Sequence, residues 1–398
     1  MRAIIHIGRP KVGSTTLQEF LWENRQELGR RGVLYHRLDP GQSSQFELPI
    51  AALTDCDRRI ADPHISKLLR IETLDDQRAY ATTMMRRFEE DLRTHGDGKE
   101  LYIASTEHAV PYLHNNRHTA ALDTILRRHF DDVTYVIYIR DQLPLYLSAY
   151  SEMIKRGGTT ALQPWLDRVL KAGELDHLRV LRAWINGVGQ DALRVRLLER
   201  DALVGGDLIE DFCHSCGISA EGLVRPAPQN LSLSRDATEV LRVLNGLVPS
   251  LLPDGRPNPL RRDLVEYLLE QFADAPPLAF TRAQAQAVQD CHATGNEKVR
   301  ALFWPGRPAL FQPRALPESD IDARIDSETA LEMALSMLIA VRQGRIAPLT
   351  GFDLRHAIST DPPTATDSGA APTRAPFIDR WPKLKSPRLR PRNFLNRG

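Results

Sequence analysis

The feature that most constrains the fold is a short loop that joins a predicted strand to a predicted helix at the start of the sequence. An apolar, β-branched run over residues 4–7 ends at Gly8, and a second glycine, Gly13, is followed by three hydroxyl side chains and an amphipathic helix. In such a loop the backbone N–H groups and the positive end of the helix dipole point toward a bound anion. The sequence therefore predicts a phosphate-binding loop over residues 8–16.

The position of the lysine distinguishes this loop from the Walker A loop of nucleoside triphosphatases. A Walker A loop reads G-x-x-x-x-G-K-[ST], and its lysine reaches the β- and γ-phosphates. Here Ser14 stands in the lysine position, and Lys11 lies inside the loop instead. A lysine at that place is expected near the bond between the first phosphate and the group that it carries. The alternative is a glycine-rich turn that only begins a helix.

A second candidate site follows a strongly predicted buried strand over residues 133–139. Arg140 comes directly after this strand, at the end where ligands bind in open α/β sheets. Asp141 is a candidate N-cap for the next helix, and Ser148 lies on the polar face of that helix. Arginine offers a planar fork of donors to phosphate oxygens, and serine adds one hydroxyl. Taken alone, the two residues also fit a strand-end ion pair and a surface serine.

A third polar segment lies between these two sites. The predicted strand over residues 101–105 runs into Thr106, Glu107 and His108. In a parallel sheet the end of this strand is expected beside the phosphate loop. Glu107 and His108 are therefore candidates for the base that removes a proton from an acceptor hydroxyl. The alternative is a glutamate that caps a helix, followed by a surface histidine.

Together these segments resemble the sulfotransferases that use 3′-phosphoadenosine 5′-phosphosulfate (PAPS), and in particular their bacterial carbohydrate type. Val12 departs from the family's P-K-[TSA]-G-[TS]-[TS] loop, and the segment 140–148 resembles the family's 3′-phosphate site. Bacterial relatives often have S-S-E at the strand end that carries Glu107, which favours Glu107 as the base. The resemblance covers about residues 1–310. The loop positions that fit the family's pattern are Pro10, Lys11, Gly13, Ser14 and Thr15.

The resemblance implies a P-loop-NTPase-like, three-layer α/β/α fold with a mainly parallel central sheet and extra C-terminal helices. It implies transfer of a sulfuryl group from PAPS to a hydroxyl of a saccharide or another acceptor, with no metal ion. Arg140 and Ser148 would hold the 3′-phosphate, and Glu107 or His108 would remove the acceptor proton. Lys11 would also stabilise the charge that builds on the leaving phosphate oxygen. The implied cofactor-binding residues of the loop are Lys11, Val12, Gly13, Ser14, Thr15 and Thr16.

Two other function classes fit parts of the sequence. One is a P-loop phosphotransferase that uses a nucleoside triphosphate and Mg²⁺, but the missing Walker lysine and the placement of Arg140 argue against it. The other is a non-catalytic, nucleotide-binding relative, and the joint presence of Lys11, Arg140 and Ser148 argues against that. We therefore expect a PAPS-dependent sulfotransferase.

Composition supports one enzyme-sized α/β protein. Hydrophobic residues make up 42% of the 398 residues, and the formal net charge of +1 does not predict binding of nucleic acid. The sequence has neither the long apolar run of a transmembrane helix nor a signal peptide before the first strand, so we expect a cytoplasmic protein. The Cys213-x-x-Cys216 pair lacks the second pair of a zinc site, and we expect it to pack in the core.

The chain is expected to form one sulfotransferase-like domain over residues 1–350, with a core over 1–220 and a helical part over 221–350. In residues 351–398 the composition becomes rich in Pro, Thr, Ala and Ser and then strongly basic. This predicts a disordered linker and a solvated tail. Contact of the basic tail with an anionic surface is an alternative.

The hydrophobic pattern predicts strands separated by helices, which is typical of a parallel sheet. One helix is predicted over residues 15–31. Residues 39–66 are expected to be irregular and to form part of the acceptor opening. The predicted strands cover residues 3–7, 33–35, 101–105, 133–139 and 193–197.

Overall fold

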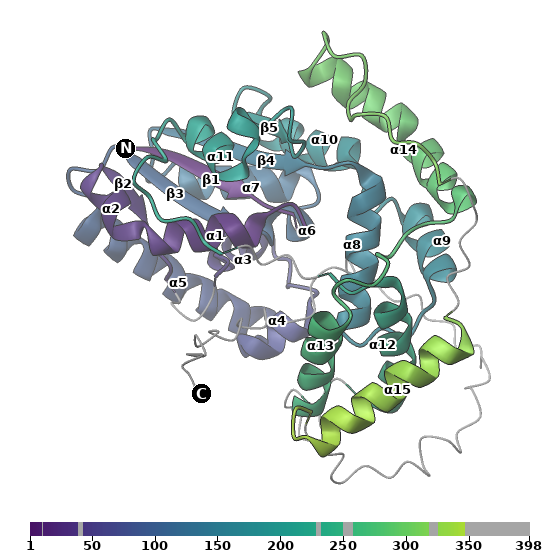
Figure 1. Cartoon of the computed structure of the whole chain (residues 1–398). Helices are drawn as coiled ribbons and strands as arrows, with labels where there is room; N and C mark the ends of the chain where they lie inside the picture. The colour runs from purple at the N-terminus through teal and green to yellow at the C-terminus, as the bar shows by residue number, and fades with distance from the viewer. Residues whose placement is uncertain (10, 39–42, 228–231, 250–257, 318–324, 347–398) are drawn as a thin grey trace, which may run out of the picture.

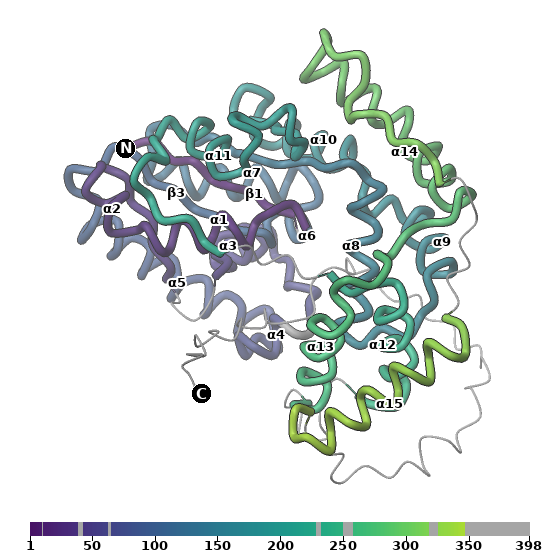
Figure 2. The backbone as a smooth tube through the Cα atoms, in the orientation of Figure 1, coloured from purple at the N-terminus to yellow at the C-terminus, as the bar shows by residue number. Residues whose placement is uncertain are grey.

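A parallel sheet with helices on both faces, next to a second group of helices, makes up the structure (Figures 1 and 2). Pro10 of the loop and the expected linker and tail lie outside the residues that are described. The structure is a computed structural model, and it describes residues 1–9, 11–38, 43–227, 232–249, 258–317 and 325–346.

The sheet has the strand order β2-β3-β1-β4-β5, and every neighbouring pair of strands is parallel. Ile7 of β1 pairs with Thr106 of β3, and His6 of β1 pairs with Val136 of β4. The carboxyl ends of β1, β3 and β4 therefore meet at one edge of the sheet. The strands are β1 (Arg2–Ile7), β2 (Val33–Tyr35), β3 (Leu101–Thr106), β4 (Asp132–Ile139) and β5 (Leu193–Leu197).

The helices fall into those that connect the strands and those that follow the sheet. The connecting helices are α1 (Ser14–Glu23), α2 (Arg25–Arg30), α3 (Glu47–Asp55), α4 (Pro63–Leu68), α5 (Leu74–His95), α6 (Ala109–Tyr112), α7 (Asn116–Leu126), α8 (Gln142–Lys155), α9 (Leu162–Ala172) and α10 (His177–Val188). After β5 come a 3₁₀ turn η1 (Val204–Gly206), α11 (Leu208–Cys216), α12 (Arg235–Leu247), α13 (Pro259–Gln271), α14 (Arg282–Phe303) and α15 (Ser327–Arg342).

Alternate side chains of the strands enter two hydrophobic cores, one on each face of the sheet. Ile5 and Tyr102 belong to the core that α3, α5, α7 and α10 cover. Ile4 and Ile103 belong to the core that α1, α8 and α11 cover. Both faces of the sheet are buried at β1, β3 and β4, which explains the nearly continuous apolar sequence of these strands. The structure thus confirms the predicted α/β/α class with a mainly parallel sheet and extra C-terminal helices.

The helix predicted over residues 15–31 is in fact two helices, α1 and α2, which meet at Asn24. The Asn24 amide nitrogen donates to the carbonyls of Phe20 and Val224, and its side-chain oxygen accepts from the Val224 N–H at 2.7 Å. The two bonds with Val224 connect the junction of α1 and α2 to a segment about 200 residues later in the sequence. A local helical pattern contains no signal for such a contact. The prediction of one helix was wrong because a tertiary contact ends α1.

The expectation that residues 39–66 are irregular was also wrong, since this segment contains α3 and the start of α4. Residues 48–53 of α3 are all buried, and they belong to the core shared with α5 and α7. A helix that is apolar all round has no amphipathic period to read. Its N-cap position is Phe46, whose side chain makes no capping bond. The sequence therefore lacked both usual helix signals.

The helices after α11 form a group with α8 and α9 to one side of the sheet (Figure 1). The Tyr146 hydroxyl of α8 is 3.0 Å from His292 Nε2 of α14. Arg261 of α13, only 2% exposed, donates to the carbonyls of Ile154 and Lys155 at the end of α8. A cation at these carbonyls satisfies the C-terminal end of the helix. Buried contacts with the C-terminal helices thus fix α8, which leads away from the ligand edge of the sheet.

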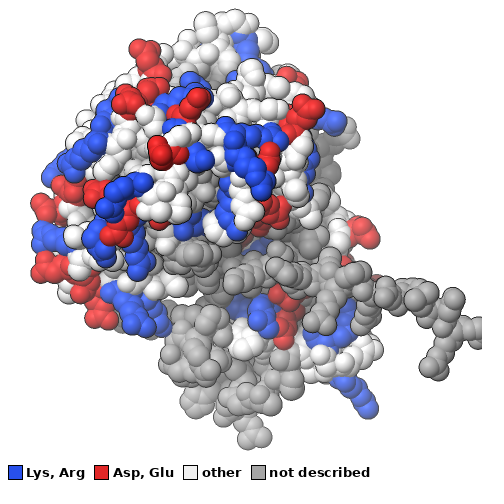
Figure 3. Space-filling view, turned by 90° about the vertical axis from the view of Figure 1, so that its left-hand side faces the viewer, with Lys and Arg blue, Asp and Glu red and all other residues white. Residues whose placement is uncertain are grey.

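The surface carries charges of both signs. On the face shown in Figure 3, Lys and Arg side chains are interspersed with Asp and Glu side chains. Some of these opposite charges form surface ion pairs, such as Arg86 with Glu90, whose charged atoms are 2.6 Å apart. None of the described helices has the length and apolar character needed to cross a membrane.

Cys213 and Cys216 pack in the core, as predicted. Both are buried free thiols on α11, with 1% and 0% of their surface exposed. Burial raises the pKa of the Cys213 thiol to about 12 and raises the pKa of the Cys216 thiol as well. Both groups are therefore protonated and apolar in character at neutral pH.

A buried ionic network joins β4, β5 and α11. The Asp211 carboxylate, completely buried, accepts from the Tyr138 hydroxyl at 2.7 Å and from Arg196 Nε at 2.9 Å. It also accepts from the Val204 N–H at 3.0 Å. Burial alone would raise the pKa of Asp211, but the bonds from Arg196 and Tyr138 lower it below the usual range. The carboxylate is therefore charged and depends on its partners.

We expect Asp211→Ala to lower the free energy of unfolding by about 3–5 kcal/mol, because it leaves Arg196 and Tyr138 without their buried partner. Chemical denaturation followed by circular dichroism measures this loss. Glu90→Ala, which removes one member of an exposed ion pair, is the control and should change the free energy little. Equal effects of the two substitutions would contradict the structural role of Asp211.

Candidate functional site

The loop after β1 starts in close contact with the end of β3. The Gly8 N–H donates to the Thr106 carbonyl at 2.9 Å, which extends the pairing of the two strands. A side chain at Gly8 would begin 2.5 Å from Ser14 Oγ and 3.2 Å from the Cα atom of Glu107. Only glycine fits between these groups. The loop and the candidate base segment are therefore adjacent, as the sequence analysis expected.

The backbone of the loop alternates in a way that suits an anion. Lys11 has a φ of 71° and Gly13 a φ of 86°, whereas Val12 between them is not in the left-handed region. Successive residues of opposite twist turn their N–H groups toward one concave side, which makes a nest for anions. The Val12 side chain is completely buried in the core on the α1 face of the sheet. Val12 is thus an apolar anchor within the loop, and the backbone geometry of a nest is present around it.

The first turn of α1 completes the loop. The N-cap residue is Gly13, and no side chain caps this helix. The Ser14 hydroxyl is buried and donates to the Arg9 carbonyl at 3.1 Å, so it braces the loop from within. Thr15 and Thr16 are half-buried at the same helix end. An uncapped helix N-terminus with neighbouring hydroxyls is suited to bind an anion.

Arg140 lies beside the loop at the end of β4. Its guanidinium donates to the Lys11 carbonyl at 3.2 Å. Its own carbonyl accepts a hydrogen bond from His177 Nε2 at 2.8 Å, so this nitrogen carries the proton. Burial, and then the charge of Arg9, lowers the pKa of His177 to about 3. A neutral histidine thus anchors the backbone of Arg140 and fixes where its side chain begins.

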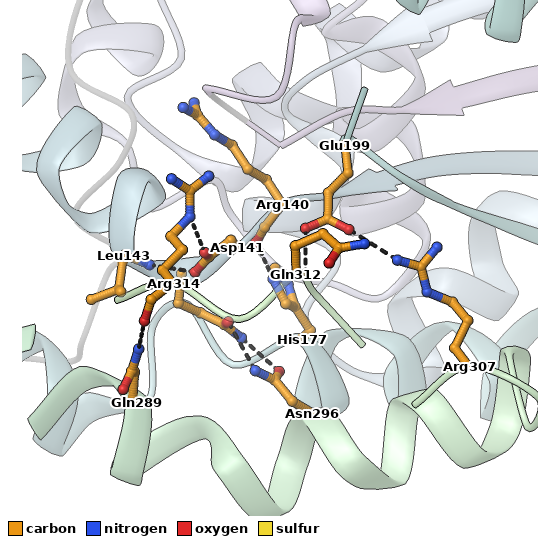
Figure 4. Close-up of polar contacts among 11 residues, drawn as sticks. Arg140, Asp141, Leu143, His177, Glu199, Gln289, Asn296, Arg307, Gln312 and Arg314 are labelled. Carbon is orange, nitrogen blue, oxygen red and sulfur yellow. Dashed lines mark hydrogen bonds and ion pairs between the residues drawn. The ribbon is translucent and has the colours of Figure 1, made fainter. Parts of the chain in front are cut away.

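Arg314 is a site residue that the sequence analysis missed. Figure 4 shows it next to Arg140, with its Nε bonded to Asp141 at 2.5 Å. Asp141 also caps α8, as predicted, by accepting from the Leu143 N–H at 2.9 Å. Burial, followed by the charge of Arg314, lowers the pKa of Arg140. The neighbouring positive charges of Arg140 and Arg314 favour a bound anion, and no local pattern links positions so far apart in the sequence.

The Lys11 side chain reaches α8. Its Nζ is 2.5 Å from Oε2 of Glu152, and Arg156 Nε is 3.0 Å from Oε1 of the same carboxylate. Burial would raise the pKa of Glu152, but the charges of Lys11 and Arg156 hold it at about 2. Burial and the charge of Lys11 lower the pKa of Lys155 to about 8. Glu152 is therefore the ion-pair partner of Lys11 in this structure. Its position one turn after Ser148 on α8 is a sequence signal that could have suggested this role.

Ser148 lies half-buried on α8, one turn before Glu152. Among the described residues, no hydrogen bond joins Ser148 to Arg140 or Lys11. Arg140 thus contacts the loop directly, through the Lys11 carbonyl. Ser148 lies on α8, the helix whose Glu152 binds the Lys11 side chain.

A pocket opens beside Lys11 between α8 and α9. Its charged side chains are half-buried and its large apolar side chains are almost fully buried, so the charges form the rim and the apolar groups the floor. The rim residues are Lys11, Glu152, Arg156 and Glu174, and the rest of the lining is Leu145, Ala149, Met153, Trp165, Val169 and Leu175.

The two candidate bases differ in their surroundings. His108 is 7% exposed, packs against the ring of Phe46 at 4.1 Å, and has its Nδ1 2.8 Å from the Ser44 hydroxyl. Glu107 is half-buried, and its N–H donates to the same hydroxyl at 3.3 Å. Ser44, which the sequence analysis did not single out, thus binds both residues.

Comparisons with known proteins give a structural likeness. The crystal structure of a sulfotransferase from Alicyclobacillus acidocaldarius is similar to this chain, with 14% sequence identity and a TM-score of 0.36. The match covers 61% of this chain and 92% of that one. No protein-family model matches the chain, and no curated protein matches it in sequence. The function is therefore inferred from the site itself.

Proposed function

We propose that this protein is a sulfotransferase that transfers the sulfuryl group of PAPS to an acceptor hydroxyl. One observation carries the proposal: the anion-binding loop, Lys11 and Arg140 lie together at the carboxyl ends of neighbouring parallel strands. The loop has no lysine after Gly13, and its only lysine lies within it. This arrangement offers two separate places for anions, one at the loop and one at Arg140 with Arg314. PAPS carries a 5′-phosphosulfate and a 3′-phosphate and so matches a site with two anion positions.

In the proposed reaction the loop N–H groups and the start of α1 bind the 5′-phosphosulfate. Arg140, supported by Arg314, binds the 3′-phosphate, and the Ser148 hydroxyl adds a donor from α8. The acceptor oxygen attacks sulfur while the bond from sulfur to the phosphate oxygen breaks. The 5′-phosphate leaves with the electron pair of that bond, and its new charge is stabilised by Lys11.

Lys11 must change partners for this chemistry. In the structure it is paired with Glu152, whose carboxylate also binds Arg156. A phosphosulfate at the loop would compete with Glu152 for the ammonium group. Lys155, the last residue of α8, and Arg156, which follows it, remain near Glu152 and would partly compensate the charge of the released carboxylate.

We propose Glu107 as the base that accepts the acceptor proton. It follows β3 at the edge where the loop lies, and it is more exposed than His108. The Phe46 ring and the Ser44 hydroxyl occupy one side of the His108 imidazole. A half-buried carboxylate next to the loop is the more accessible of the two groups to an incoming hydroxyl.

We propose a saccharide as the acceptor. The pocket beside Lys11 has a rim of charged side chains and a floor that includes Trp165. Charged groups accept and donate hydrogen bonds to sugar hydroxyls, and an apolar floor suits the C–H faces of a sugar ring. The position of Lys11 on this rim would bring an acceptor hydroxyl near the transferred group.

The first prediction from this proposal concerns the nucleotide. We expect 3′-phosphoadenosine 5′-phosphate (PAP), the product, to raise the melting temperature, because it binds the folded state alone. At a hundredfold excess over its Kd the stabilisation should be about 2.7 kcal/mol. Differential scanning calorimetry with PAP and with ATP–Mg²⁺ measures this. Stabilisation by ATP–Mg²⁺ without any by PAP would overturn the proposal in favour of a phosphotransferase.

The second prediction concerns the 3′-phosphate. Arg140→Ala should weaken binding of PAP by about 1.5–3 kcal/mol, or roughly 10- to 150-fold, because a charge-assisted contact is lost. Binding of adenosine 5′-phosphosulfate, which has no 3′-phosphate, should change much less. Titration calorimetry compares the two ligands, and Arg128→Ala at an exposed arginine is the control. Equal weakening of both ligands would make Arg140 a structural residue instead.

The third prediction concerns the chemical step. Lys11→Ala should lower turnover more than it lowers PAP affinity, because its charge matters most as the leaving oxygen becomes charged. Glu107→Gln should lower turnover about 10²- to 10⁴-fold with nearly normal PAPS binding. Single-turnover sulfation of a saccharide panel, followed by mass spectrometry, provides the rates.

His108→Ala is the matched variant for the base. It should fold and retain more activity than Glu107→Gln, since the proposed role of His108 is to support the neighbouring strand end. An inactive His108→Ala with an active Glu107→Gln would reverse the assignment. Glu152→Gln tests the resting partner of Lys11, and it should tighten PAPS binding because a competing negative charge is removed.

A further inference from the structure

Helix α15 presents a row of apolar side chains to solvent. Leu331, Leu335, Leu338 and Ile339 are 50–64% exposed, and they are a large share of the exposed large hydrophobic residues in the described parts of the chain. Elsewhere such residues are scattered over several elements, as Val243 is on α12. Apolar side chains gathered on one face of a helix mark an interaction site rather than ordinary surface. We call these four residues the α15 stripe.

The opposite face of α15 holds the helix on the body of the protein. Met333 and Ala340 are each 1% exposed, and the Tyr267 hydroxyl of α13 donates to the Ser336 carbonyl at 3.1 Å. Figure 1 shows α15 crossing α12 and α13 at the outside of the helical group, away from the sheet. The helix is thus anchored on one side, and the α15 stripe faces outward.

The spacing of the stripe is that of a helix-pairing seam. Leu331, Leu335 and Leu338 of the stripe follow one another at intervals of four and three residues. This is the alternation by which two helices pack along a common seam. A single helix of matching periodicity is therefore the shape that the stripe fits.

The charges at the two ends of α15 identify the partner. Glu328 and Glu332 are exposed at its N-terminal end, and Arg342 is exposed at its C-terminal end. A second copy of α15 in antiparallel orientation would bring each acidic end opposite a basic end. A parallel copy would bring like charges together. The helix is therefore complementary to itself in one orientation only.

We propose that the protein forms a symmetric dimer in which the α15 stripes of two copies pack antiparallel. Such a two-fold contact uses the same surface on both copies and closes on itself. None of the candidate site residues lies on α15. The dimer therefore neither depends on the proposed sulfotransferase activity nor supplies a residue to it.

Sedimentation velocity of the full chain over a range of concentrations tests the dimer. The wild type is expected to sediment as a dimer, and Leu335→Glu/Leu338→Glu is expected to raise the dimer dissociation constant at least about 100-fold. Val243→Glu, at an exposed apolar residue of α12, should leave the dimer intact. The melting temperature of each variant reports whether it remains folded. A wild type that is monomeric at every concentration would overturn the proposal.

Charge reversal tests the orientation. Glu328→Lys/Glu332→Lys should weaken the dimer, and so should Arg342→Glu, because each variant opposes like charges in an antiparallel pair. Mixing the two variants should restore a dimer that contains one copy of each. Equal dimerisation of the separate variants and of the mixture would contradict antiparallel pairing. Binding of a monomeric wild type to vesicles of anionic phospholipid, lost in Leu335→Glu/Leu338→Glu, would assign the stripe to a membrane surface and refute the dimer.

Discussion

The pairing of β1 between β3 and β4 is the constraint on which the site depends. Because all three strands are parallel and in register, their carboxyl ends meet at one edge, and the polar segments that follow them meet there too. Gly8 shows how tight this meeting is, since a side chain would collide with Ser14 and approach the backbone of Glu107. The hydrophobic sheet thus sets the distances among groups that are far apart in sequence.

In the site, carboxylates form ion pairs with basic side chains. Glu152 binds Lys11, and Asp141 binds Arg314 beside Arg140. A half-buried cation without a partner is costly, so the pairing of Lys11 with Glu152 stabilises the site. In the function we propose, an anionic ligand would replace the Glu152 carboxylate as the partner of Lys11, and its affinity would be the difference between the two sets of contacts. On that proposal, residues that do not touch the ligand would tune its binding strength.

The C-terminal helices determine where α8 lies and hence what Lys11 can reach. Arg261 donates hydrogen bonds to the last carbonyls of α8. His292 contacts the hydroxyl of Tyr146 on the same helix. The segment after α14 brings Arg314 to the start of the same helix (Figure 4). The helical group therefore completes the site from one side, while its outermost helix, α15, presents an apolar face to a partner. A single set of helices serves the site on its inner side and association on its outer side.

The sequence by itself determined the features that are local: the strands, the loop between Gly8 and Gly13, the Asp141 cap and the burial of Cys213 and Cys216. These depend on periodicity, on backbone freedom or on neighbouring residues, and such signals are contained in a few positions. Tertiary structure alone decided the rest. It ended α1 at Asn24 through Val224, formed the fully buried α3, and placed Arg314 beside Arg140. These outcomes come from contacts between distant segments, whose energies no local pattern records.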